Sequence, residues 1–150
     1  MNALTIRPLD RRDIPAILEI QSSNRQAAQW PQSAYEGLEK TGENAWVAEQ
    51  NAIVLGFLVA RVVSDEMEIL NLAVQPDSRR QGIGGELLQH IISWAGEIRV
   101  RRVFLEVRLS NTVARKFYEA NGFVQTGIRP NYYSDPAEAA LLLAKSLDRK

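Results

Sequence analysis

The chain of 150 residues contains no cysteine and a single histidine, His90. The missing cysteine excludes disulfides, thiolate metal ligands and a cysteine nucleophile. With only one histidine, a histidine-rich metal site is also excluded and a Ser-His triad is disfavoured. We therefore expect no metal site, and a chemistry that relies on carboxylates, tyrosines and backbone groups.

Long apolar runs and an excess of charge of one sign are also missing. No stretch approaches the ~18 to 20 consecutive apolar residues of a membrane span, and no apolar segment follows the charges at the start of the chain as in a secretory signal. Lys and Arg total 18, as do Asp and Glu, so no overall field attracts nucleic acid. These absences predict a cytoplasmic protein that binds neither membranes nor nucleic acid directly. The length suits a single domain over residues 1–150.

The apolar pattern predicts an alternation of strands and helices. Three β-rich runs separated by short turns predict an antiparallel meander, and a strand-helix-strand unit at 66–107 predicts one parallel pair with a right-handed crossover. The last strand has a composition that would also suit a helix. The predicted strands are 4–7, 44–50, 53–63, 66–76, 101–108, 123–129 and 138–147, and the predicted helices begin near Asp10 or Asp13, at Pro31, at Gly82 and at Thr112. This order predicts an α/β (α+β) fold, with a mixed, mostly antiparallel sheet of about seven strands flanked by about four helices.

The stretch RRQGIGGELL, residues 79–88, places three glycines where the long helix should begin. Glycine in a helix interior costs about 1 kcal/mol relative to alanine. Free backbone N–H groups and the positive end of a helix dipole favour a phosphate at this position. Gly82 and Gly84 would let phosphates reach those amides, and Arg79 and Arg80 add positive charge. The alternative is a tight strand-to-helix turn with a solvated arginine pair.

Two common phosphate motifs do not fit the loop. A Walker loop requires Lys followed by Ser or Thr after its last glycine, and Glu86 and Leu87 occupy those positions. A dinucleotide fingerprint would require glycine in place of Leu87. The loop therefore predicts some other phosphorylated ligand.

The pattern Arg79-x-x-Gly82-x-Gly84 resembles the R/Q-x-x-G-x-G/A motif of the GNAT N-acetyltransferases. The segments NLAVQPDSRRQGIGGELL and FLEVRLSNTVARKFYEANGF are similar to the core of that superfamily. LEVRLSN, KFYEANGF and IRPNYY resemble its RimI type, whose members acetylate the N-terminal alanine of a ribosomal protein. The resemblance implies acetyl-CoA as cosubstrate, with its pyrophosphate held by the loop residues Arg79, Arg80, Gln81, Gly82, Ile83, Gly84 and Gly85.

The same resemblance implies two catalytic residues. Glu106 matches the general base, although it would otherwise read as an outward-facing carboxylate on an amphipathic strand. Tyr118 matches the general acid that protonates the leaving thiolate, although it could simply pack on the apolar face of its helix. An ordinary glutamate at ~4.3 and an α-amine at ~7.8 are mismatched by roughly 5 kcal/mol, and a lysine amine at ~10.4 would add near 3.5 kcal/mol. An α-amine acceptor is therefore favoured.

The remaining site residues also come from the resemblance. Asn111 matches a position that contacts acetyl-CoA, and it could equally be a helix N-cap. The backbone of Leu72, Ala73 and Val74 matches the strand that pairs with the pantetheine arm. Tyr132 and Tyr133 match the tyrosines that shape the slot for the peptide N-terminus, although they could merely finish a strand.

Two departures from the RimI type border the acceptor. The chain has Trp30 followed by Pro31-Gln32-Ser33 where P-W-S is expected, and Glu138 where an aspartate is expected. The leading hypothesis is direct transfer, in a ternary complex, of an acetyl group to the N-terminal alanine, or a similar small residue, of a ribosomal protein, by a monomer or weak dimer. The alternatives are a lysine or small-molecule amine as acceptor, or a non-catalytic acyl-CoA-binding module.

Overall fold

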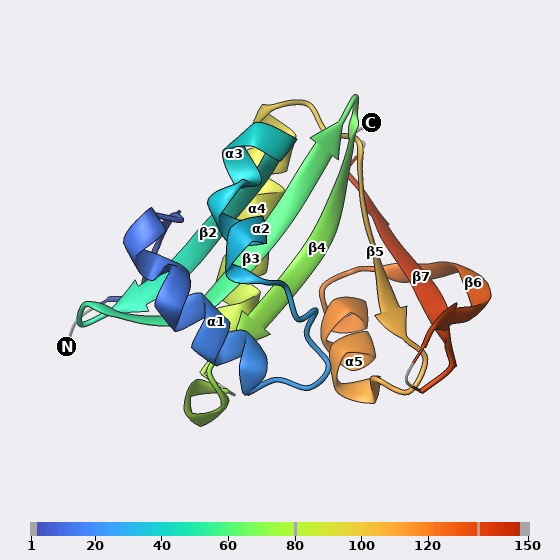
Figure 1. Cartoon of the computed structure of the whole chain (residues 1–150). Coiled ribbons are helices and arrows are strands. Elements are labelled where there is room, and N and C mark those ends of the chain that lie inside the picture. The colour runs from blue at the N-terminus through green and yellow to red at the C-terminus, as the bar shows by residue number, and fades with distance from the viewer. Residues whose placement is uncertain (1–2, 80, 135, 148–150) are drawn as a thin grey trace.

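The computed structural model describes residues 3–79, 81–134 and 136–147. Their strands form one sheet in the order β1-β2-β3-β4-β5-β7-β6, with helices on both faces (Figure 1). The elements along the chain are β1 (Thr5–Pro8), η1 (Arg11–Asp13), α1 (Ile14–Ser22), α2 (Gln32–Glu36), α3 (Leu38–Thr41), β2 (Glu43–Gln50), β3 (Ile53–Val63), β4 (Glu66–Val74), η2 (Pro76–Ser78), α4 (Ile83–Glu97), β5 (Arg102–Arg108), α5 (Thr112–Ala120), β6 (Val124–Tyr133) and β7 (Glu138–Ser146).

The predicted meander and the predicted parallel pair are both confirmed. β2, β3 and β4 pair antiparallel, and β4 pairs parallel with β5 through α4. At the β2–β3 turn, Asn51 and Ala52 both have positive φ, as a type I′ hairpin requires. The last strand, β7, lies between β5 and β6 and pairs antiparallel with each.

The two faces of the sheet carry separate apolar clusters. Because side chains alternate along a strand, Phe57 and Val59 on β3 face α1 and α2, whereas Leu58 faces α4. Figure 1 shows α1, α2 and α3 in front of the sheet and α4 behind it. α4 packs closely on the sheet at Gly56, where an added Cβ would lie 3.1 Å from the carbonyl oxygen of Ala73 and 3.3 Å from the side chain of Leu87.

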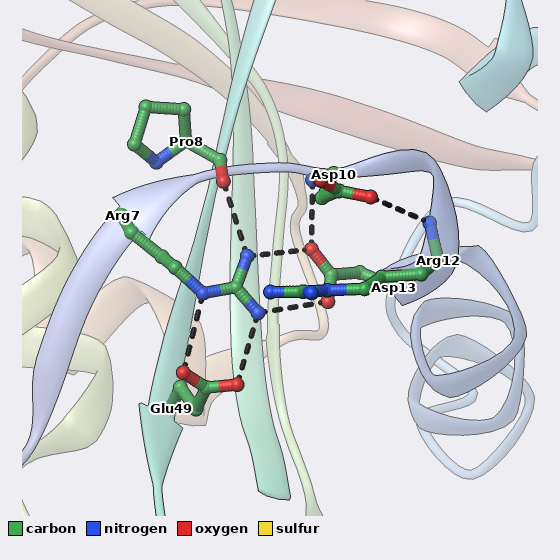
Figure 2. A network of polar contacts seen from close by, with 6 residues as sticks. All are labelled: Arg7, Pro8, Asp10, Arg12, Asp13 and Glu49. Carbon is green, nitrogen blue, oxygen red and sulfur yellow. Dashed lines mark hydrogen bonds and ion pairs between the residues drawn. The ribbon is translucent and has the colours of Figure 1, made fainter. Parts of the chain in front are cut away.

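An ion-pair cluster fastens β1 to its neighbours (Figure 2). The guanidinium of Arg7 lies 2.8 Å from a carboxylate oxygen of Asp13 at the start of α1, and 3.0 Å from one of Glu49 on β2. Asp13 also accepts a hydrogen bond from the backbone N–H of Asp10, whose side chain in turn caps η1. The cluster therefore joins three elements at the edge of the sheet.

The predicted helices and strands differ from the observed ones in detail. The helix that begins after Pro31 is divided into α2 and α3 at Gly37, so the described residues contain five α-helices rather than about four. The long helix has Gly82 as its N-cap and begins at Ile83. The strand predicted at 123–129 continues to Tyr133. Within the described ranges no helix is long and apolar enough to cross a membrane.

Candidate active site

β4 and β5 pair only near their beginnings. The paired residues are Glu66 with Arg102, Met67 with Val103, and Glu68 with Phe104. Beyond them β4 continues along β3, and β5 continues along β7, so the two strands part (Figure 1). The second half of β4, which includes Leu72, Ala73 and Val74, therefore has no strand partner on its β5 side among the described residues. A ligand with amide groups could pair with that strand edge.

The glycine loop follows β4 and leads into α4, as the sequence predicts. Gly82 has φ +78°, a left-handed conformation that L side chains rarely adopt. A Cβ on Gly84 would lie 3.5 Å from the ring of Phe117 on α5, whereas a Cβ on Gly85 would meet nothing within 4 Å. The N–H groups of the first turn of α4 have no intrahelical acceptor and are not covered by Cβ atoms at Gly82 or Gly85.

The other loop residues predicted to bind the cofactor have different surroundings. Ile83 is buried in the core, so only its backbone can contribute to binding. Gln81 is exposed, and Arg80 lies outside the described residues. Arg79 is exposed and its guanidinium donates a hydrogen bond to the side-chain oxygen of Asn24.

Asn24 is a bridging residue that the sequence did not reveal. Its side-chain amide donates to the carbonyl oxygens of Val74, at 3.1 Å, and Ile20, at 2.7 Å. The connection between α1 and α2 is thereby tied both to the end of β4 and, through Arg79, to the glycine loop. Asn24 lies in a polar, loop-like stretch, and nothing in the sequence distinguished it from its neighbours.

Glu106 lies in the part of β5 that has separated from β4. Leu105 and Val107 are buried on the α4 and α5 side, so Glu106 projects from the opposite face. Only 14% of its side chain is exposed, and its Oε2 is shielded from solvent without a hydrogen-bond partner in the described part of the chain. The Nε atom of Arg129 on β6 lies 3.8 Å from this oxygen. Glu106 is therefore not a solvated surface carboxylate.

Tyr118 lies on the other side of β5, in the core beneath α5. Its ring packs edge-on between Phe117, at 5.1 Å, and Phe123, at 5.3 Å between ring centroids. Burial raises the pKa of the Tyr118 phenol above its ordinary value. The phenol is therefore a neutral proton donor over the whole physiological range. The side chains of Glu106, on β5, and Tyr118, on α5, thus lie on opposite sides of β5.

Asn111 caps α5. Its side-chain oxygen accepts a hydrogen bond from the N–H of Ala114 at 3.2 Å. The N-cap alternative is therefore confirmed, and a contact between Asn111 and acetyl-CoA stays a prediction.

Tyr132 and Tyr133 lie at the end of β6, each beside an arginine. The Cζ atom of Arg108 is 4.3 Å from the ring centroid of Tyr133, and that of Arg129 is 5.5 Å from the ring centroid of Tyr132. Asn131, with φ +54°, lies where the register between β6 and β7 shifts. Asparagine tolerates this left-handed conformation better than most residues. Neither arginine was predicted as a site residue.

The two positions that depart from the RimI pattern both have structural partners. Trp30 is half-buried, with its ring 5.5 Å from that of Tyr35, and its carbonyl oxygen accepts a hydrogen bond of 2.6 Å from Gln21. Glu138 lies 3.3 Å from the guanidinium of Arg108 and accepts a hydrogen bond from the N–H of Ser110. These hydrogen bonds and the ion pair lower the pKa of Glu138 below its ordinary value. Glu138, which is one methylene longer than the expected aspartate, therefore links the start of β7 to the end of β5.

A hollow of about 840 Å³ lies elsewhere, between α1 and the β2–β3 turn. Its lining includes Asp13, Glu19, Glu49 and Asp77, and none of the predicted site residues. The predicted site residues therefore lie outside this hollow.

The fold is that of an acyltransferase. The model of the acetyltransferase (GNAT) family matches residues 10–123. The [ribosomal protein bS18]-alanine N-acetyltransferase of Escherichia coli K12 is 35% identical over 142 residues, which cover 93% of this chain and 95% of that protein. The crystal structure of the Escherichia coli ribosomal-protein-S18-alanine N-acetyltransferase superposes with a TM-score of 0.87 at 33% identity, covering 99% of this chain and 96% of the other. That of Ard1 from Thermoplasma volcanium also gives 0.87, at 32% identity and with 98% and 99% covered. The chain therefore belongs to the acetyltransferase (GNAT) family.

Proposed function

We propose that this protein transfers the acetyl group of acetyl-CoA to the α-amine of the N-terminal alanine, or a similar small residue, of a ribosomal protein. The similarity to the bS18-alanine N-acetyltransferase over nearly the whole of both chains supports this acceptor. An acceptor of this kind places the reaction in the cytoplasm. The absence of cysteine supports direct attack in a ternary complex, because no thiol can carry the acetyl group between the two substrates.

The observation that carries the proposal is the state of Glu106. A shielded carboxylate oxygen without a hydrogen-bond donor costs about 1 to 3 kcal/mol or more, and such a group in a native protein calls for an explanation. Oε2 of Glu106 is such an oxygen, and it lies where β4 and β5 have parted. An acceptor amine would supply the missing donor.

The chain has features that suit acetyl-CoA. The first turn of α4 offers N–H groups to a pyrophosphate, and the unpaired edge of Leu72, Ala73 and Val74 offers backbone groups to the amides of the pantetheine arm. When bound, acetyl-CoA supplies an acetyl thioester, whose acetyl carbon forms a bond to the acceptor nitrogen as its bond to sulfur breaks.

Glu106 and Tyr118 then divide the proton transfers. Glu106 takes the proton that the amine loses, directly or through water, and the hydroxyl of Tyr118 gives a proton to the departing sulfur. The raised pKa of Tyr118 makes this donation harder than it would be for an exposed phenol. The same apolar surroundings also disfavour a free thiolate. Burial therefore makes it harder for Tyr118 to give up its proton, but it also makes the departing thiolate more ready to accept that proton.

The experiment that tests the proposal is acetylation of a short peptide beginning with alanine, which carries the N-terminal sequence of the organism's own bS18 protein. A second peptide has its α-amine blocked and one internal lysine free, and mass spectrometry locates the added acetyl group. We expect acetylation of the free α-amine only. Acetylation of lysine, or of neither peptide, would contradict the proposed acceptor.

A pair of variants separates catalysis from binding alone. Glu106→Gln should slow single-turnover acetylation by roughly 10²- to 10⁴-fold while leaving the affinity for acetyl-CoA unchanged. Glu68→Gln is the matched control, because Glu68 is a half-buried glutamate on β4 whose ion pair with Arg61 measures 3.0 Å. Coenzyme binding by the unaltered protein without acetylation of any amine would instead support a non-catalytic module.

A further inference from the structure

Glu106 and Arg129 lie on one face of the sheet, on either side of β7. Glu106 is opposite Leu142, and Arg129 is opposite Ala140, two residues along β7. Residues directly opposite in a sheet share a face, and residues two apart along a strand share it too. Gly127 is the residue of β6 that is level with Glu106, and it has no side chain to separate the pair.

The contact between the two side chains is electrostatic and is not a hydrogen bond. Nε of Arg129 lies 3.8 Å from Oε2 of Glu106, beyond hydrogen-bond length. The charge of the guanidinium therefore reaches the carboxylate while the hydrogen-bonding capacity of Oε2 stays unused. The side chain of Arg129 is 56% exposed and also lies beside the ring of Tyr132.

The other charged and titratable groups near Glu106 have partners of their own. Arg108, on the same strand, forms an ion pair with Glu138 of β7 and lies over the ring of Tyr133. The pKa of Tyr133 is raised by burial first and then by the negative charge of Glu106, so its phenol is neutral. Among the described residues, Arg129 is thus the cation that forms an ion pair with Glu106 itself.

We propose that Arg129 is a positioning residue whose charge makes an acceptor amine docked on Glu106 react in its neutral form. This inference rests on the proposed function. A carboxylate alone favours the protonated form of a docked amine, because opposite charges attract. A guanidinium beside that carboxylate offsets this effect, because it disfavours a second positive charge next to it. The pair therefore favours amines that lose their proton readily, such as an α-amine at ~7.8, over a lysine amine at ~10.4.

The test is the pH dependence of the single-turnover rate constant, measured with saturating acetyl-CoA and the alanine peptide. In the complex of Arg129→Gln the amine keeps its proton to higher pH, so we expect the acid limb of the profile to move up by about 1 pH unit. The rate at a pH on that limb then falls about tenfold, whereas the rate on the plateau stays within about twofold. Arg129→Lys keeps the charge and should leave the limb near its original position.

Arg102→Gln is the matched control. Arg102 also pairs with a glutamate, Glu66 at 3.2 Å, and lies over an aromatic ring, Phe104 at 5.1 Å, but at the other end of β5. This variant should leave the acid limb where it is. An unmoved limb in Arg129→Gln, or an equal loss of rate at every pH, would overturn the inference while the proposed function stands. Failure of the unaltered protein to acetylate the α-amine would overturn the proposed function, and this inference with it.

Discussion

The two proposed catalytic side chains differ in their burial and hydrogen bonding. Glu106 keeps one carboxylate oxygen shielded and without a hydrogen-bond donor among the described residues, whereas Tyr118 lies between two phenylalanine rings. The first arrangement is suited to accepting a proton from an incoming amine. The second holds a proton that leaves only when a base, such as the departing thiolate, comes close enough to accept it.

Tyr118 leads to a prediction about alkaline pH. Its pKa is raised by burial, so the phenol keeps its proton at pH values where an exposed tyrosine, at about 10, begins to ionise. The single-turnover rate of the unaltered protein should therefore show no decline between about pH 8 and pH 10 from loss of this proton. Tyr118→Phe should be at least about tenfold slower throughout that range.

The unfolding temperature of Tyr118→Phe serves as the control for packing, because phenylalanine fills nearly the same volume between Phe117 and Phe123. A rate equal to that of the unaltered protein would show that Tyr118 only packs. A slower rate with an unchanged unfolding temperature would support its role as the acid.

The ion-pair cluster of Arg7, Asp13 and Glu49 joins β1, the start of α1 and β2 (Figure 2). Burial raises the pKa of Asp13, but the hydrogen bonds from Arg7 and from the backbone of Asp10 lower it by more, so it ends below its ordinary value. A depressed pKa stabilises the fold above the unfolded value of about 3.9, and that contribution is lost as the pH falls through the folded value. Asp13→Asn should therefore lower the free energy of unfolding by about 1.5 to 3 kcal/mol at neutral pH, as measured by urea denaturation.

The destabilisation by Asp13→Asn should shrink as the pH is lowered, because the carboxylate that it replaces becomes protonated in the native protein too. Glu36→Gln is the matched control, since Glu36 pairs with Arg11 at 3.5 Å on the surface. This exposed pair should contribute less than about 1 kcal/mol. A pH-independent difference for Asp13→Asn would contradict the ionic explanation.

Two glycines of the α4 region provide a contrast in backbone conformation. Gly82 has a positive φ at the N-cap, whereas Gly96 lies in the last turn of α4. Apart from the adjoining backbone, an added Cβ at either position would meet no atom of the described residues within 4 Å. Gly96→Ala should raise the free energy of unfolding by about 0.5 to 1 kcal/mol. Gly82→Ala should lower it by about 1 kcal/mol or more, because alanine is strained there.

Calorimetric titration with acetyl-CoA then separates stability from binding. Weaker binding is expected for Gly82→Ala, whose first-turn N–H groups would shift, and unchanged binding for Gly96→Ala. Equal affinity in both variants would show that the conformation of the loop does not matter for the cofactor.

The local spacing of apolar residues accounts for most of the helices and strands that were predicted from the sequence. Ile83, Leu87, Leu88 and Ile91 recur at helical spacing and are all buried in α4. The division at Gly37 and the extension of β6 to Tyr133 were missed, because a break in a weak helix and an irregular strand end depend on packing more than on periodicity. The last strand, which also suited a helix by composition, is fixed as a strand by pairing with both β5 and β6.

At the scale of the whole molecule, strand order decides which residues meet. Glu106 and Arg129 are distant in sequence and become neighbours only because β7 is inserted between β5 and β6. Family resemblance indicated Glu106 and Tyr118 but gave no reason to consider Arg129 or Arg108. Registers between distant strands depend on long-range pairing, and no local signal in the sequence carries them.

Strand order also bears on self-association, because β1 and β6 are the edges of the described sheet. β6 exposes Val124, at 63%, and Ile128, at 50%, which could favour pairing with a second copy. The register of β6 against β7 is irregular at two places, however, and Arg129 adds a charge next to Ile128. Bulges and charges are common devices that keep edge strands from pairing.

We therefore predict a monomer at micromolar concentrations and at most a weak dimer at higher ones, as measured by sedimentation equilibrium. Ile128→Lys should abolish any such dimer, whereas a stable dimer that persists in this variant would place the contact elsewhere.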